Sequence, residues 1–375
     1  MLPALLAGML LAASPTYDVS LRSEARASTD GEGDGQLNPA LSFNLPLGHL
    51  SLLAEYTPRI LLFEPGTSKK ISVLHSGHFA AEQRFGRATR LVVDQQVSYG
   101  ENTFSFLVTG ADLTQPSFDR VNFDRLSQLP PFLYFSETTR LSIDQALSRK
   151  VLLSVAASYG IAGGADSAAR ALAPVQRLSR LRLILGWELG THDGLFAAVD
   201  GSTDFFSSSQ RSYLLDAGGG WRHQFSKYTD FDIAAGGAAG RDVNTDFIEN
   251  RLYPYFAAAI RRRFVQGARD VLRGSLNVRL APAIDPISGR IYLRADTFGT
   301  LNYFPILHLG LTAIAGGAIA VSGPLQGQKL GFGGAGVVYE FSPYLSLSTG
   351  MRAVALPNVT AVGFFAITVS DRGRF

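Results

Sequence analysis

Apolar and polar residues alternate along most of this chain. In residues 288–305, SGRIYLRADTFGTLNYFP, the odd positions carry Leu293 and Leu301, and the even positions carry Arg294 and Asp296. Side chains of a β-strand point to opposite faces in turn, so this segment predicts a strand with one apolar and one charged face. No long amphipathic helix is predicted between segments of this kind. The pattern therefore predicts an all-β protein.

The alternation predicts eighteen strands. They span residues 16–28, 37–47, 49–63, 69–85, 89–101, 132–148, 151–162, 179–190, 194–206, 211–226, 229–241, 251–264, 271–281, 289–304, 306–321, 328–342, 344–355 and 360–370. Most of them exceed the five or six residues of ordinary globular strands and reach the roughly nine to eleven that a tilted strand needs to cross a bilayer. Their length therefore favours strands that span a membrane.

The connections between these strands alternate in length. Short turns follow the even-numbered strands, as at 227 and 305, whereas longer polar connections follow most odd-numbered strands, as at 102–131, 163–178 and 241–250. An up-and-down membrane barrel has short periplasmic turns at one end and longer outer loops at the other. The alternation in length is thus a second, independent indication of a barrel.

Composition narrows the possible classes of protein. The 375 residues include 34 basic and 31 acidic side chains, which give a net charge of +3, and no cysteine. The charges are scattered, without the dense basic patch that nucleic-acid binding requires, so nucleic acid is not an expected partner. The apolar N-terminus, MLPALLAGMLLAASP, predicts a signal peptide over residues 1–15, which leaves 16–375 as the mature domain.

These patterns together predict a single transmembrane antiparallel up-and-down β-barrel of about 18 strands, located in the bacterial outer membrane. In hydrocarbon every backbone polar group needs an internal partner, so strands cross a bilayer only as a closed barrel. A charge on the lipid-facing side at mid-bilayer costs about 2–4 kcal/mol, and the charged face is therefore expected to point inward. Barrels of this size enclose an aqueous channel.

The inward face supplies the candidate functional residues. Each of them could be either a structural wall residue or part of a transport path. The candidate pore-lining residues are Arg90, Asp94, Arg140, Asp144, Arg180, Arg182, Glu188, Asp216, Arg222, Tyr253, Tyr255, Arg273, Arg279, Tyr292, Arg294 and Asp296. The tyrosines, together with Phe298, could offer stacking surfaces to sugars, and the charged groups could hydrogen-bond their hydroxyls.

Motifs for catalysis or cofactors are weak. The six histidines show no catalytic spacing, and solvated or interfacial histidines are the simpler interpretation. The segment GFGGAG at 331–336 satisfies a dinucleotide-binding pattern. It precedes the strand-like VVYEF, whereas a dinucleotide-binding loop precedes a helix, so we do not expect it to bind a dinucleotide. No P-loop is present. We expect no enzyme activity, no cofactor and no metal.

The N-terminal half resembles a family of outer-membrane barrels encoded with polysaccharide export systems in myxobacteria and relatives. The resemblance lies in LLAEYTPRILLFEP at 52–65, LHSGHFAAEQRF at 74–85 and TRLVVDQQVSYGENTFSFL at 89–107. It implies an outer-membrane conduit for a polysaccharide chain, beneath which a separate periplasmic export protein docks. The C-terminal Phe375 resembles the signal that barrel assembly machinery recognises, although Asp371 interrupts the usual alternation before it.

Three other functions fit a barrel with a polar interior. The first is a general diffusion porin for small solutes, in which segment 102–131 folds inward as a constriction. The second is a barrel lipid hydrolase or protease. The third is a structural or adhesive barrel whose outer loops bind partners. The sequence favours the passive export conduit, with the diffusion porin as the alternative.

Overall fold

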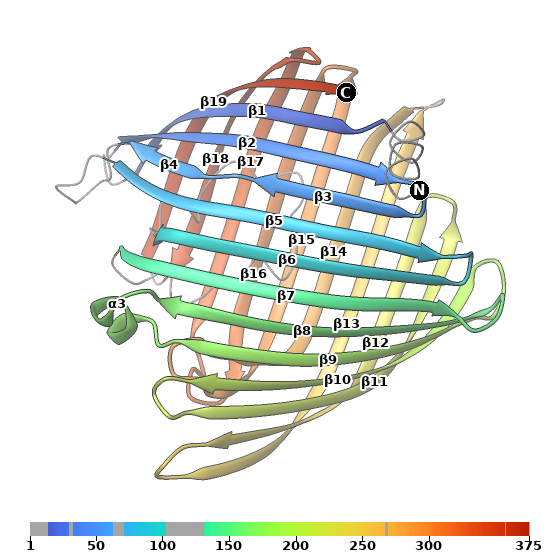
Figure 1. The fold of residues 1–375 in the computed structure, drawn as a ribbon, viewed down its shortest axis with the longest axis vertical. Coiled ribbons are helices and arrows are strands. Elements are labelled where there is room, and N and C mark those ends of the chain that lie inside the picture. The colour runs from blue at the N-terminus through green and yellow to red at the C-terminus, as the bar shows by residue number, and fades with distance from the viewer. Residues whose placement is uncertain are drawn as a thin grey trace, which may run out of the picture.

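The computed structural model describes residues 14–29, 33–62, 71–102, 131–266, 269–356 and 358–374. Within these ranges nineteen strand segments form one sheet (Figure 1). They are β1 (Thr16–Ser28), β2 (Gly33–Leu47), β3 (Leu50–Tyr56), β4 (Arg59–Leu62), β5 (Ile71–Phe85), β6 (Thr89–Asn102), β7 (Phe132–Ala146), β8 (Val151–Gly164), β9 (Gln176–Glu188), β10 (Asp193–Phe206), β11 (Arg211–Ser226), β12 (Thr229–Val243), β13 (Ile248–Gln266), β14 (Arg269–Ile284), β15 (Ile291–Ile306), β16 (Leu309–Ser322), β17 (Lys329–Ser342), β18 (Leu345–Leu356) and β19 (Asn358–Arg374).

The sheet closes on itself as an antiparallel barrel. Each strand pairs with its neighbours in sequence, and β1 pairs with both β2 and β19. Segments β3 and β4 both lie between β2 and β5 and together make one strand, so the barrel has eighteen strands. We call the end with the short connections, such as 227–228 and 307–308, the turn end, and the opposite end the loop end. The predicted fold class is confirmed.

One predicted strand, 49–63, is interrupted. Thr57 and Pro58 separate β3 from β4, and the Thr57 amide donates a hydrogen bond to the Ser76 carbonyl at 2.8 Å. Proline has no amide hydrogen and cannot donate to a ladder, which explains a break at this point.

A short helix, α3 (Ser167–Leu172), lies within the predicted loop 163–178. It is capped by Asp166, whose side chain accepts a hydrogen bond from the Ala169 amide at 2.7 Å.

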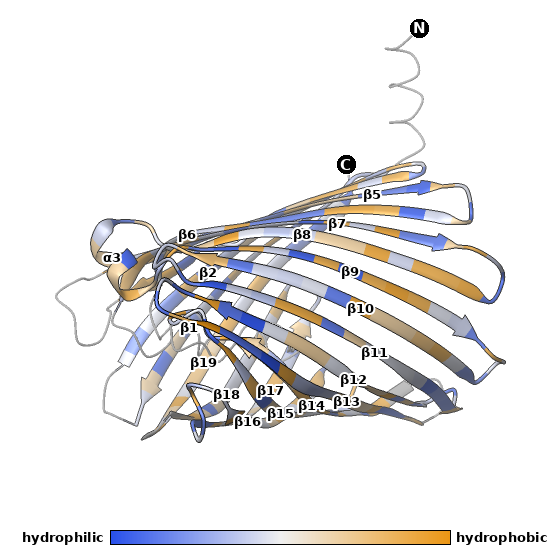
Figure 2. Ribbon diagram, turned by 90° about the horizontal axis from the view of Figure 1, so that it is seen from below, coloured by the Kyte–Doolittle hydropathy of each residue, from blue (hydrophilic) through white to orange (hydrophobic). Residues whose placement is uncertain are grey.

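Hydropathy alternates along the strands as the sequence predicts (Figure 2). One face carries the large exposed apolar side chains, for example Leu183, Val199 and Leu215, which are 41%, 43% and 55% exposed. The other face carries buried charges such as Asp200 and Asp204. The apolar face is the outer surface of the barrel and the charged face lines its lumen. No helix in the described part of the chain is long and apolar enough to span a membrane.

Two arginine substitutions on β10 should distinguish the two faces. Val199 lies on the outer face, and Ala198 lies on the inner face beside Asp200. Val199→Arg should destabilise the barrel in lipid vesicles by about 2–4 kcal/mol, because the charge meets hydrocarbon, whereas Ala198→Arg should cost far less. Urea-induced unfolding in vesicles measures both. Equal costs for the two variants would contradict the assignment of the faces.

Candidate functional site

Charged side chains of opposite sign pair with one another on the inner wall. Asp232 bridges two neighbouring strands, because its carboxylate accepts from Arg222 Nε at 2.7 Å and from Arg261 Nη2 at 2.8 Å. Glu82 likewise bonds Arg84 and Arg90 at 2.8 and 2.7 Å. These pairs join side chains that the antiparallel register places on one face. The lumen therefore presents a wall of mixed sign in which many charges already have a partner.

Several predicted pore-lining residues come together in such pairs. Arg90 also approaches Asp144 at 3.7 Å, Arg294 Nε lies 2.6 Å from Asp296, and both Arg180 and Arg182 contact Asp200. The register sets Arg140 opposite Asp94, Arg279 opposite Asp296, and Asp216 opposite Asp200.

The remaining candidates lie in different surroundings. Glu188 is exposed near the turn end, Arg273 lies over the ring of Phe304, and Tyr255 is half-buried. That the candidate residues line a transport path stays a prediction.

The aromatic candidates lie mostly within packed clusters. Tyr253 is 5% exposed, Tyr292 is 8% exposed against Ala320, and Phe298 is 5% exposed, with its ring centroid 5.7 Å from that of Phe332. Their rings are covered by other side chains. A passing sugar chain could stack on them only after neighbouring residues move.

Sequence reasoning missed His78 as an inner-wall residue. Its Nδ1 lies 2.8 Å from Glu55 and its Nε2 lies 2.6 Å from Asp94, so one imidazole links β3 to β6 through β5. His75 lies on the outer face, where its Nδ1 is 2.7 Å from the Tyr56 hydroxyl. The two histidines point to opposite faces, as their spacing predicts. The useful signal for His78 was an acidic residue on the inner face of each flanking strand: Glu55 lies directly opposite it, and Asp94 lies two residues along β6 from the opposite position.

The tip of the hairpin formed by β14 and β15 leaves the wall. Strand β14 pairs with β13 only as far as Leu280, and β15 pairs with β16 only from Leu293 onward. In this part of the structure, residues 248–255 of β13 have no strand paired on the β14 side. Two prolines, Pro254 and Pro282, lie in the separated stretches, where a missing amide hydrogen costs no ladder bond.

We call residues 281–294 the inner flap, because they fold against the inner faces of β11, β12 and β13. Ile291 and Leu293 pack on Ala238 and Tyr253 in an apolar cluster in which Ile291 is 2% exposed. Leu214, Leu280 and Ile284 pack around this cluster. The apolar side of the flap thus meets protein, although its alternation resembles that of a lipid-facing strand.

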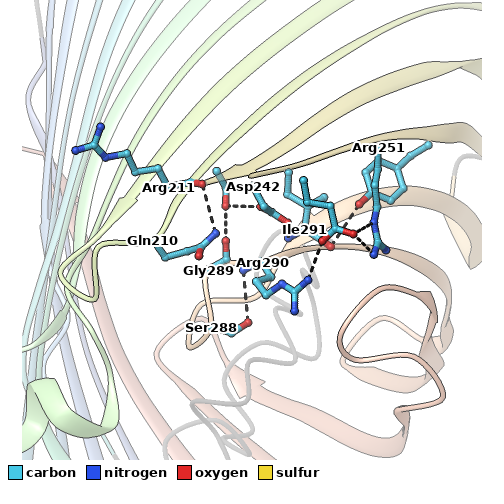
Figure 3. Close-up of polar contacts among 11 residues, drawn as sticks. Gln210, Arg211, Asp242, Arg251, Ser288, Gly289, Arg290 and Ile291 are labelled. Carbon is cyan, nitrogen blue, oxygen red and sulfur yellow. Dashed lines mark hydrogen bonds and ion pairs between the residues drawn. The ribbon is translucent and has the colours of Figure 1, made fainter. Parts of the chain in front are cut away.

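Polar contacts fix the flap across strands that are not neighbours (Figure 3). Buried Asp242 of β12 accepts from the Ser212 hydroxyl at 2.8 Å and from the Ile291 amide at 3.0 Å. The Gly289 carbonyl of the flap also contacts the Ser212 hydroxyl, whose single hydrogen is shared between this carbonyl and Asp242, and Arg290 donates to Glu249 at 2.8 Å. The flap is therefore held to β11, β12 and β13 by hydrogen bonds as well as by apolar packing.

Two glycines permit this close approach. Gly289 has a φ of 67°, and a Cβ there would lie 2.6 Å from Gln210 Cγ and 2.7 Å from Phe206 Cδ2. A Cβ at Gly240 would lie 2.8 Å from Tyr253 Cε2 and 2.9 Å from Ile291 Cδ1. Larger residues at either position would push the flap toward the lumen.

The diffusion-porin hypothesis placed a constriction at 102–131, of which residues 103–130 lie outside the described residues. In the described part of the barrel, the much shorter flap narrows the lumen at the loop end. No three His, Asp or Glu side chains of the described residues are grouped so that they could hold a metal ion.

The comparisons with known proteins agree with this geometry. A model of the EpsX exopolysaccharide export family matches residues 7–363. The chain belongs to the EpsX exopolysaccharide export family. A search of curated proteins finds no match. This EpsX-family chain is similar in fold to the outer membrane protein OpdK of Pseudomonas aeruginosa, with a TM-score of 0.50, 9% identity and coverage of 96% of this chain and 99% of that one.

The structure of OpdK with vanillate gives a TM-score of 0.51, again with 9% identity and coverage of 96% and 99%. The FrpB iron transporter of Neisseria meningitidis gives 0.53 with 10% identity, and the match covers 90% of this chain and 62% of FrpB. At such identities the likeness concerns the fold alone. The family, the closed barrel and the apolar outer surface identify this EpsX-family protein as an outer-membrane polysaccharide export barrel.

Removing one inner carboxylate should change the ion selectivity of this EpsX-family barrel. Asp232→Asn leaves Arg222 and Arg261 without their shared carboxylate, and their side chains stay hydrated because they are 68% and 52% exposed. Stability should therefore change by no more than about 1 kcal/mol, while the reversal potential in a salt gradient shifts toward anions. Arg222→Gln should shift it the opposite way. Unchanged reversal potentials in both variants would show that ions avoid this wall.

Proposed function

We propose that this barrel is a passive conduit through which a secreted or capsular polysaccharide crosses the outer membrane, delivered by a separate periplasmic export protein. The observation that carries the proposal is the ion-paired inner wall. A polymer rich in hydroxyl groups needs hydrogen-bond partners along its path, yet each contact must be weak enough to release it. Side chains that already satisfy one another, such as Asp232 with its two arginines, provide exchangeable contacts without a strong binding site.

The passive character follows from the absence of an energy source in the sequence. No P-loop is present, so movement of the polymer has to be driven from elsewhere in the cell envelope. Synthesis of the chain or its delivery from the periplasm could supply that force. The barrel then contributes a closed, hydrated passage with no edge exposed to lipid.

The turn end supports docking of a periplasmic partner. Short turns of such barrels face the periplasm. Exposed charges lie near this end on strands that are not neighbours in the barrel: the side chains of Arg84 on β5 and Arg372 on β19 are 65% and 75% exposed, and Arg372 pairs with Asp18 at 2.6 Å. A polar, charged rim is suited to a reversible protein contact.

A strain that lacks this barrel tests the proposal. Without it, polymer should disappear from the medium and the cell surface while its synthesis continues, and the wild-type gene should restore export. Uptake of small solutes should be unchanged. Normal export combined with reduced solute uptake would instead identify a diffusion porin. In planar bilayers, a conductance altered by the purified periplasmic partner would support the docking part of the proposal.

A further inference from the structure

Charged side chains on the outer face are rare and concentrated. Along the loop-end halves of the described strands, the positions on the outer face carry Glu137, Arg177, Arg211, Arg241 and Lys329. Three of these five are arginines on β9, β11 and β12, and all three are exposed. An arginine on the lipid-facing side costs about 2–4 kcal/mol at mid-bilayer and far less near the interface, so these three, close to the loop ends of their strands, mark an interfacial surface on one sector of the wall.

The strand register brings the three arginines together with aromatic residues. Arg177 lies opposite Phe205, and Phe205 lies opposite Arg211, whose guanidinium is 5.8 Å from the Phe205 ring centroid. Arg241 lies one row deeper, opposite Tyr213. Strands are spaced by about 4.8 Å, so Arg177 and Arg211 are about 10 Å apart along the rim. We call these three residues the arginine cluster.

No carboxylate of the described residues neutralises this cluster. Among the residues that the structure describes, no ion pair involves any of the three arginines, in contrast to the paired arginines of the lumen. Figure 3 shows the Arg211 side chain extending away from the lumenal network, to which this residue contributes only its carbonyl as the acceptor for Gln210. The cluster therefore presents its positive charge outward.

An apolar hollow lies directly below the cluster. It has a volume of about 440 Å³, and two rows of outer-face residues border it. The upper row contains Thr203, Tyr213, Arg241 and Asn250, and the lower row contains Gly201, Leu215, Ala239 and Leu252. Small residues at 201 and 239 make the depression, and Leu252 beside it is 86% exposed.

We propose that this surface binds a glycolipid of the outer leaflet that carries at least two phosphate groups and several acyl chains. Guanidinium groups bind phosphate through paired, charge-assisted hydrogen bonds. Three of them, spread over three strand spacings of about 4.8 Å each, suit more than one phosphate, whereas a phospholipid with a single headgroup phosphate, such as phosphatidylethanolamine, offers only one. The hollow lies on the membrane side of the cluster, where it receives an acyl chain. Arginines whose side chains only extend from the wall into the aqueous phase would need no apolar hollow beside them.

The site also borders the separated part of β13. Asn250 and Leu252 belong to the stretch that has no strand paired on the β14 side. The inner flap covers the unpaired edge of β13 only on its lumenal side. A lipid bound at this site would cover the same edge on its outer side. The inference goes beyond the proposed function, because it concerns the outer surface and not the polymer path.

Binding of diphosphoryl lipid A in detergent micelles tests the proposal. The purified barrel should bind it saturably, and Arg177→Gln/Arg211→Gln/Arg241→Gln should lower the affinity at least tenfold. Arg262→Gln is the matched control, because Arg262 also lies on the outer face, over Phe264 at 4.5 Å, but toward the turn end. Lipid A stripped of its phosphates should bind the parent protein at least tenfold more weakly.

A second variant tests the hollow without touching the cluster. Gly201→Phe places a ring in the depression, where a Cβ would meet only Leu215 Cδ1, at an ordinary 3.7 Å. It should weaken diphosphoryl lipid A binding severalfold while strand content stays unchanged. Equal affinity of the triple variant and the parent, or equal binding of phosphorylated and stripped lipid A, would overturn the proposal. Neither result depends on whether the lumen exports a polymer.

Discussion

A barrel in which residues 283–292 are replaced by Asn-Gly is expected to conduct more current than the native barrel. The replacement removes most of the inner flap, which occupies the loop end of the lumen, and leaves the remaining wall strands paired. Asn-Gly is the favoured two-residue hairpin turn and should close β14 onto β15 at the shortened end. The largest polyethylene glycol that still reduces the single-channel current should be larger for the shortened barrel.

Shortening a different loop-end element provides the control for this experiment. Replacing 165–172, which contain α3, with a Gly-Ser linker removes a similar length of chain, which packs against β7 and β8. Conductance should then remain near the native value. If flap removal left both the conductance and the polymer size limit unchanged, the flap would not narrow the path that ions take.

The strand positions were predictable from the sequence because lipid outside and water inside impose alternation on every strand. Predicted and observed bounds differ mainly by a few residues at strand ends, as for 229–241 against β12 (Thr229–Val243). Such ends matter, because Asp242, which anchors the flap, lies beyond the predicted end of its strand. Glu249 likewise falls before the predicted start at 251. Alternation fades where the wall meets water, so the anchoring residues gave no periodic signal.

The flap itself could not be predicted from alternation. Leu280, Ile291 and Leu293 continue the apolar face of their strands, which the pattern assigns to lipid. In the structure they pack against Tyr253 and the inner wall. A period of two residues reports that one face is apolar but not whether that face meets lipid or protein. Pro254 and Pro282, which cannot donate to a ladder, were the local signs of a broken edge.

The ion pairs of the lumen were partly predictable. Opposite charges such as Arg294 and Asp296 recur two residues apart on the charged face, and the structure joins them at 2.6 Å. Pairs between strands depend on the register, which sets Asp232 opposite Arg222. Since a shift of one residue would turn these side chains to the other face, alternation assigned each residue to a face but not to a partner.

Replacing Asp242 with alanine should release the inner flap from the wall. The substitution removes two hydrogen bonds to a buried carboxylate, from the Ser212 hydroxyl and from the Ile291 amide. Only the bond from the Ile291 amide joins Asp242 to the flap, because Ser212 belongs to β11 of the wall. Hydrogen bonds to charged groups contribute about 1.5–3 kcal/mol each, so the flap should lose roughly that amount of stabilisation. The released population should then rise roughly tenfold or more. The eighteen strands should stay paired, because Asp242 lies at the loop end of β12.

Reaction of a single cysteine with a maleimide measures this release. The chain has no native cysteine, so Ile291→Cys, at a position only 2% exposed, provides a unique reporter. Labelling should be slow in this background and at least tenfold faster when Asp242→Ala is added. Asp216→Ala is the matched control, because it removes an inner carboxylate from neighbouring β11 that faces Asp200 and, among the described residues, forms no hydrogen bond or ion pair with the flap. Equal labelling rates with and without the Asp242 carboxylate would show that apolar packing alone holds the flap against the inner wall.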